Sequence, residues 1–212
     1  MTQILMYHSL SGIVLAADGR AVVHSEADEA PEFITVQKLF QLTPQAVLAA
    51  GGAGYGILLC QGFLSYIQRT GIQDIEEVID HALPFFSSRI DVVRQRSSPF
   101  PVQAELERVY ILIAGCTFQP ADTDPFQVAF IASDSLSDPL HTVKTGNVLT
   151  IPRQLGVEYS LSRLDTSYDS IQTAEAVCEK YLHKMAKDGN EVGFPFYVAR
   201  ITLDGIRIRI IE

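Results

Sequence analysis

The sequence predicts a layered α+β domain, in which helices cover two packed sheets of mostly antiparallel strands. Apolar segments paired across short turns begin and end the chain, and two long helical patterns lie between them. Strands that come in consecutive runs argue against an alternating, parallel α/β fold. With 212 residues, 47% of them hydrophobic, the chain can form one generous core, so we expect a single domain over 1–212.

The chain begins with a predicted β-hairpin. Two apolar segments, 3–7 and 12–17, flank a turn that ends in glycine. Counting outward from Leu10 places Thr2 opposite Asp18. Once the initiator methionine is removed, a terminal threonine would face a carboxylate, and this suggests a nucleophile that uses its own amine as the base.

Further strands and a glycine-rich bend follow this hairpin. The patterns predict a short extended piece over 20–24, a strand over 33–42 and a buried strand over 45–50. The acidic segment 25–32 between them is expected to face water, with the rim of a substrate groove as the alternative interpretation. The bend 51–56 lacks the Gly-Lys-Ser/Thr of a phosphate loop, so close strand-to-helix packing and an oxyanion hole remain as its two interpretations.

Two helices and a second group of strands complete the predicted domain. Apolar residues recur at helical spacing over 54–70 and 74–96, with Gly71 ending the first helix and Pro84 as a kink or break in the second. A third helix is predicted over 169–187. The strands of this half are expected at 109–116, 126–132, 141–145, 196–203 and 206–211, the last two joined by Asp-Gly.

The composition argues against several classes of function. A net charge of -9 disfavours a nucleic-acid partner, because such proteins usually carry a basic patch. Cys60, Cys116 and Cys178 lie in apolar segments without a paired motif, which favours buried free thiols in a reducing compartment. The five histidines show no metal-binding spacing, so we predict no metal and no cofactor. We expect a cytoplasmic protein, because neither a signal peptide nor a membrane-spanning apolar run is evident.

Several segments occur in an order typical of one family. They are 12–21, with its acidic residue and following arginine, 38–41, with its lysine, the glycine bend 50–54, and the later segments 111–115, 145–146 and 198–205. Over nearly the whole chain the sequence resembles the proteasome β-type subunits and HslV, which are N-terminal nucleophile (Ntn) hydrolases. The resemblance implies a four-layer αββα sandwich, with two mostly antiparallel sheets flanked by helices.

The resemblance also implies a set of catalytic residues. Thr2 Oγ would attack the scissile carbonyl, and its α-amine, which titrates near ~8, would accept the proton. Lys38 would supply positive charge beside Thr2, Asp18 would orient Lys38, and the backbone N–H of Gly51 would stabilise the oxyanion. Because the amine must be free, activity would require removal of Met1.

Supporting and substrate-binding positions follow from the same resemblance. Arg20 matches the arginine that follows the family's acidic residue. Asn147 stands where the family has a serine, and Asp188 matches a family aspartate, whereas Val192 replaces the serine beyond it. The residues expected to line a pocket for apolar side chains are Ala21, Val36, Ala49 and Ala53.

Three functions are compatible with these observations. The first is a threonine peptidase that acts on peptides or unfolded proteins inside a ring of identical subunits, with which an ATPase could associate. The second is a non-catalytic Ntn subunit with a structural or binding role. The third is a small-molecule amidase, because a shared fold does not set the substrate.

Overall fold

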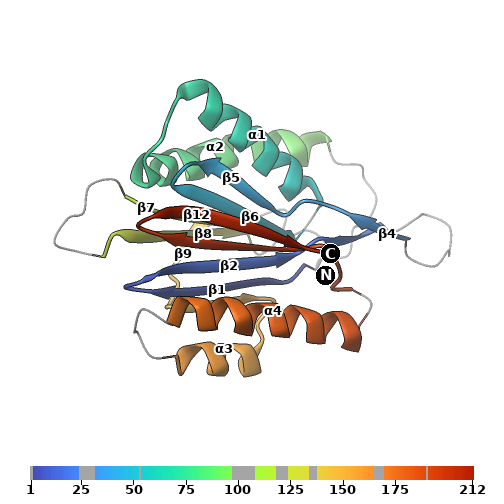
Figure 1. Cartoon of the computed structure of the whole chain (residues 1–212). Coiled ribbons are helices and arrows are strands. Elements are labelled where there is room, and N and C mark those ends of the chain that lie inside the picture. Colours follow the sequence, from blue (N-terminus) through green and yellow to red (C-terminus); the bar gives the residue numbers. More distant parts are fainter. Residues whose placement is uncertain are drawn as a thin grey trace.

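In the computed structural model, the described residues are 2–23, 32–52, 54–96, 108–117, 124–133, 138–164, 170–189 and 191–212. They form four helices and two five-stranded antiparallel sheets, together with a separate two-stranded pair (Figure 1). The predicted α+β class is therefore confirmed. None of the helices in these ranges is long and apolar enough to cross a membrane.

The first sheet has the N-terminal hairpin at its centre, in the strand order β10-β1-β2-β11-β12. Its strands are β1 (Ile4–Ser9), β2 (Gly12–Asp18), β10 (Val148–Ile151), β11 (Phe196–Thr202) and β12 (Gly205–Ile211). Every residue of β2 is buried, because both faces of this sheet are covered. The hairpin predicted from the apolar segments is therefore the central element of the sheet.

The register of this hairpin corrects the predicted pairing of Thr2 with Asp18. Gln3 N donates to Asp18 Oδ1 at 2.8 Å, and Asp18 N donates to Gln3 O at 3.2 Å. Gln3 is therefore the partner of Asp18, and Thr2 lies one residue beyond. The turn contains two residues, 10–11, whereas counting outward from Leu10 assumes a single central residue.

The second sheet has the order β5-β6-β7-β8-β9, and its formation divides one predicted strand. Its strands are β5 (Leu39–Thr43), β6 (Ala46–Gly52), β7 (Val109–Cys116), β8 (Phe126–Ser133) and β9 (His141–Val143). The prediction of one continuous strand over 33–42 is wrong, because this run is divided between two strands. Its first part is β4 (Glu32–Thr35), which pairs with β3 (Arg20–Val23) outside both large sheets. The division allows Lys38 to lie between two strands that belong to different sheets.

The helices are α1 (Gly54–Thr70), α2 (Ile75–Arg96), α3 (Leu155–Ser162) and α4 (Ser170–Asp188). The helix α2 continues through Pro84, so the predicted break does not occur. The sequence pattern did not predict α3, whose apolar residues stand at every second position from 155 to 161, as in a strand. Only Val157 and Leu161 of these four are buried, at the i, i+4 spacing of one helix face.

Three apolar clusters hold the elements together. The helices α1 and α2 pack on the second sheet through residues such as Phe63 and Phe86. The two sheets pack on each other through residues such as Leu15 and Leu112. A third cluster, which includes Cys178, joins α3 and α4 to the first sheet. Figure 1 shows the two pairs of helices on opposite sides of the strands.

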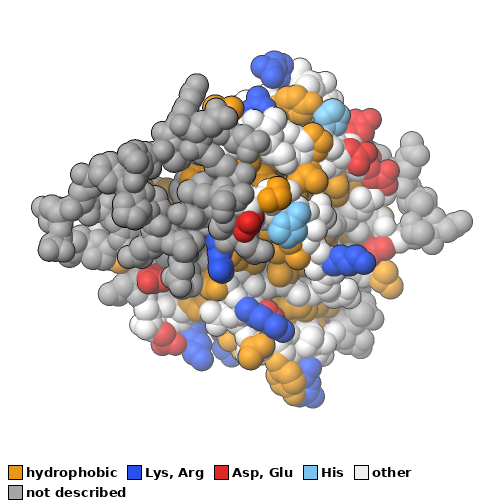
Figure 2. Space-filling view, turned by 180° about the vertical axis from the view of Figure 1, so that it is seen from behind, with side chains coloured by type: hydrophobic (Ala, Val, Ile, Leu, Met, Phe, Trp, Pro, Cys, Tyr) orange, Lys and Arg blue, Asp and Glu red, His pale blue; other side chains and the backbone are white. Residues whose placement is uncertain are grey.

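The three cysteines are buried free thiols, as the sequence predicted. Burial raises the pKa of the Cys178 thiol to about 12 and also raises that of Cys60. Such thiols remain protonated near neutral pH and are poor nucleophiles. Figure 2 shows acidic, basic and apolar side chains intermixed over the described part of one face.

Candidate active site around Thr2

A buried ion pair joins the two sheets next to the start of the chain. Lys38 precedes β5 and Asp18 ends β2, and Lys38 Nζ donates to Asp18 Oδ1 at 2.8 Å. The side chains are only 1% and 0% exposed, respectively. Lys38 Nζ also donates to the carbonyl of Arg20. Burial of two charges costs several kcal/mol per ion unless such hydrogen bonds compensate.

The Asp18 carboxylate is held from several directions. Besides Lys38, it accepts hydrogen bonds from Gln3 N at 2.8 Å and from Arg20 N at 3.1 Å. These bonds fix the orientation of the carboxylate. One of the donors belongs to the residue directly after Thr2. The lysine, the aspartate and the beginning of β1 are therefore positioned together.

Burial lowers the pKa of Lys38 below its ordinary value, because the protein interior disfavours the charged form. The negative charge and the hydrogen bond of Asp18 act in the opposite direction, but they do not outweigh the effect of burial. A lysine in this environment releases its proton more readily than a lysine in water. Perturbed groups of this kind are common in active sites.

Gly51 brings the backbone of β6 against the Thr2 side chain. A Cβ atom added to Gly51 would lie 3.3 Å from Thr2 Cγ2 and 3.1 Å from Ile4 Cδ1. At the next position, Gly52 has a φ of +85°, and a Cβ there would collide with the carbonyl of Arg108. The glycine bend thus has a packing role and also lies beside Thr2. The role of Gly51 N–H as an oxyanion donor stays a prediction.

Arg20 contributes to the site through its backbone as well as its side chain. Its N–H and its carbonyl bind Asp18 and Lys38, respectively. Its guanidinium packs so closely on Gly193 that a Cβ there would collide with it, and it also lies 5.2 Å from the ring centre of Phe33. Arg20 therefore lies next to Asp18 and Lys38, and its supporting role stays a prediction.

Asn147 does not lie near Thr2, which contradicts its predicted supporting role. Its carbonyl accepts a hydrogen bond from His8 N at 2.7 Å, toward the far end of β1. The six residues from Thr2 to His8 correspond to roughly 20 Å of extended strand. Because β10 runs antiparallel to β1 and ends with Ile151 opposite Ile4, the residues beside Thr2 are those that follow β10.

The segment after β10 is therefore a part of the site that sequence reasoning missed. Gln3 Nε2 donates to the carbonyl of Pro152 at 3.3 Å. The next residue, Arg153, donates to Glu158 at 3.1 Å, and Glu158 also accepts a hydrogen bond from Thr150 at 2.8 Å. These contacts hold the segment against the start of α3. This segment reaches the site because β10 pairs antiparallel with β1. The sequence pattern does not predict β10, so it does not reveal this contact.

Asp188 is the exposed last residue of α4. In the part of the chain that the structure describes, no hydrogen bond or ion pair joins Asp188 to Thr2, Asp18 or Lys38. The chain beyond α4 does reach the site, since Gly19 N donates to Gly193 O at 3.2 Å. A role for Asp188 stays a prediction.

The four residues predicted to line a substrate pocket lie in different surroundings. Val36 is half-buried and donates its N–H to Gly19 O at 2.7 Å, and Ala21 lies nearby, opposite Ile34. Ala49 is completely buried between the two sheets and offers no surface to a substrate. Ala53 lies outside the described residues.

Comparison of the chain with protein-family models and with curated proteins found no match. Among the described residues, no group of three or more His, Cys, Asp or Glu side chains is arranged to bind a metal ion.

The first prediction concerns the proton affinity of Lys38. NMR titration should give Lys38 a pKa below the ordinary value of 10.5, and Asp18→Asn should lower it further because the carboxylate charge is removed. At pH values between the pKa of Lys38 in the native protein and its pKa in the unfolded chain, the unfolded chain binds more protons. The free energy of unfolding should therefore rise with pH in this range. Lys38→Met should abolish this rise. A Lys38 pKa at or above 10.5 would contradict the interpretation.

Proposed function

We propose that this protein is a threonine peptidase of the N-terminal nucleophile type, in which Thr2 hydrolyses peptide bonds. The observation that carries the proposal is the buried pair of Lys38 and Asp18, whose carboxylate also binds the N–H of the residue after Thr2. A lysine with a lowered pKa, a fixed carboxylate and a threonine beside a glycine backbone form a compact set of groups for acyl transfer.

The reaction begins with the free α-amine of Thr2. The amine accepts the hydroxyl proton while Oγ attacks the scissile carbonyl carbon, and the resulting oxyanion is stabilised by the N–H of Gly51. The ammonium then gives its proton to the leaving amine as the C–N bond breaks, which leaves an ester on Thr2. Attack by water, again with the amine as base, releases the acid and restores the hydroxyl.

Lys38 and Asp18 support this cycle without forming a bond to the substrate. The charge of Lys38 lowers the proton affinity of the neighbouring hydroxyl and amine, and Asp18 keeps the lysine in place. Arg20 contributes backbone groups to both side chains. The roles of Lys38 and Asp18 are thus electrostatic and positional, whereas Thr2 supplies both the nucleophile and the base.

We further propose that residues 1–212 form one domain with the four-layer αββα arrangement of Ntn hydrolases. Three separate apolar clusters support this arrangement, one between each pair of successive layers. The hairpin with the nucleophile is in the first sheet, and Lys38 precedes the first strand of the second sheet. The proposed site therefore lies where the two inner layers meet.

The substrate and the assembly are inferred from the same family resemblance. The side chains of Ala21 and Val36 suit small apolar substrate residues. We propose that the subunits form a ring that encloses the sites, which would keep a broadly active peptidase from folded proteins. An ATPase that unfolds substrates would be a suitable partner for such a ring.

The second prediction tests the nucleophile. In protein whose intact mass shows that Met1 is absent, Thr2→Ala should lower the hydrolysis of fluorogenic peptides by at least about 1,000-fold, whereas Thr2→Ser should retain measurable activity. Light scattering should show the same oligomer for both variants.

Three results would decide against the peptidase. Full activity of Thr2→Ala would exclude Thr2 as the nucleophile. Absence of peptide cleavage in Met1-free protein, with assembly unaffected by Thr2→Ala, would favour a non-catalytic subunit. A monomer that hydrolyses only small amides would favour the amidase.

The third prediction tests the close contact of β6 with Thr2. Gly51→Ala should lower kcat/KM about 10- to 100-fold, because the new methyl group displaces the Thr2 side chain. Gly54→Ala is the matched control, since a Cβ at Gly54 has no neighbour within 4 Å. Its activity should stay within about twofold of the unmodified protein. Equal activities of the two variants would contradict the proposed geometry.

A further inference from the structure

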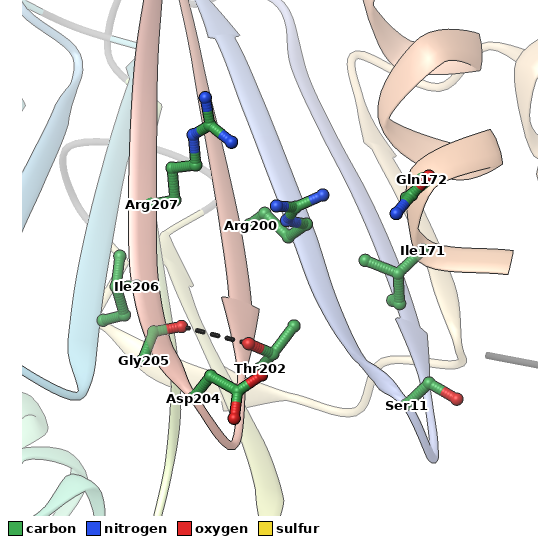
Figure 3. Close-up of a pocket in the computed structure, with 9 residues that line it drawn as sticks. All are labelled: Ser11, Ile171, Gln172, Arg200, Thr202, Asp204, Gly205, Ile206 and Arg207. Carbon is green, nitrogen blue, oxygen red and sulfur yellow. Dashed lines mark hydrogen bonds between the residues drawn. The ribbon is translucent and has the colours of Figure 1, made fainter. Parts of the chain in front are cut away.

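A polar cavity lies at the end of the molecule away from Thr2. Its volume is about 230 Å³, and it is lined by the β1–β2 turn, the β11–β12 hairpin and the first turn of α4 (Figure 3). Ser11 lines this cavity and precedes β2, whereas Asp18 ends that strand. The seven residues from Ser11 to Asp18 correspond to roughly 23 Å of extended chain, so the cavity is separate from the proposed active site.

Two arginines from neighbouring strands line the cavity. Arg200 of β11 lies directly opposite Arg207 of β12 in the antiparallel register. Like charges directly opposite each other destabilise a strand pair. Their pairing is unexpected in a chain with a net charge of -9, where carboxylates outnumber basic groups. Figure 3 shows Arg200 between its strand and α4, with Arg207 beside it.

The nearby carboxylates are engaged mainly by a third arginine. Arg209 donates to Glu175 at 2.7 Å and to Glu179 at 2.9 Å. Arg200 is left with a longer contact of 3.5 Å to Glu175. Arg207 is exposed and has no ion-pair partner among the described residues. Among the basic groups of the cavity, Arg207 is therefore the one whose charge is left to bind an added anion.

The first turn of α4 adds to this positive potential. The turn contains no acidic residue, and a helix N-terminus carries partial positive charge. The Gln172 amide and the Ser11 hydroxyl line the same cavity and can donate further hydrogen bonds, whereas the Thr202 hydroxyl donates to the Gly205 carbonyl at 3.4 Å. Asp204 is the only carboxylate among the lining residues, and it lies at the exposed tip of the hairpin.

We propose that this cavity binds a compact anion with two negative charges, as carried by a phosphate group or a small dicarboxylate. Arg200 and Arg207 would each contribute charge-assisted hydrogen bonds, with Gln172 on the opposite wall. The volume is below the roughly 300–1,000 Å³ of pockets for drug-sized ligands, which fits a small ion. Bound anion would also relieve the repulsion between the two arginines.

Isothermal titration calorimetry with inorganic phosphate and, separately, with succinate tests this proposal and identifies the type of anion. At least one of them should bind saturably at a stoichiometry of one. Arg207→Gln should weaken that binding about 10-fold or more, because it removes a charged donor. Arg69→Gln, which removes an exposed arginine at the end of α1, should leave it within about twofold.

A second variant tests whether the cavity selects its ligand by negative charge. Asp204→Asn removes the only lining carboxylate and preserves a turn sequence that suits a hairpin, so it should strengthen binding about two- to fivefold. Absence of saturable binding up to about 10 mM of either anion would overturn the proposal. Equal losses in Arg207→Gln and Arg69→Gln, or loss of binding in Asp204→Asn, would also overturn it.

Discussion

The ion pair between Lys38 and Asp18 is the interaction on which the rest of the site depends. It connects the end of β2 in one sheet to the residue before β5 in the other, and both charges are almost completely buried. Replacement of a buried ion pair by apolar residues of similar volume often leaves a protein equally stable. The stability of the fold alone therefore gives little reason for this pair. Its contact with Gln3, the residue directly after Thr2, gives a chemical reason. The proposed function accounts for a feature that packing does not require.

The backbone around this pair is as important as the two charges. Asp18 is oriented by N–H groups on both sides of it, and Lys38 is held partly by a carbonyl. Gly51 allows β6 to approach Thr2, and no other residue would leave that space free. A catalytic arrangement of this kind depends on strands that are fixed in register, because backbone groups cannot move independently of their sheet.

Much of the fold could be predicted from the sequence because its signals were local, whereas the contact of Lys38 with Asp18 was expected from the family resemblance. Alternating or helical apolar patterns located both terminal hairpins and three of the four helices. The missed helix α3 has the apolar spacing of a strand, and the run 33–42 contains no turn residue where it divides. Asn147 was expected near Thr2 but lies near His8. Its neighbours depend on the pairing of β10 with β1, a contact between residues far apart in the chain.

The proposed nucleophile requires a hydroxyl and a free amine on the same residue. The most direct measurement is therefore the mass of the N-terminal peptide after reaction of the protein with a peptide epoxyketone, which needs both groups to form its adduct. The proposed mechanism predicts one adduct on Thr2, which is lost in Lys38→Met. A chain that begins with Thr2 and remains unmodified, or an adduct at another residue, would contradict it.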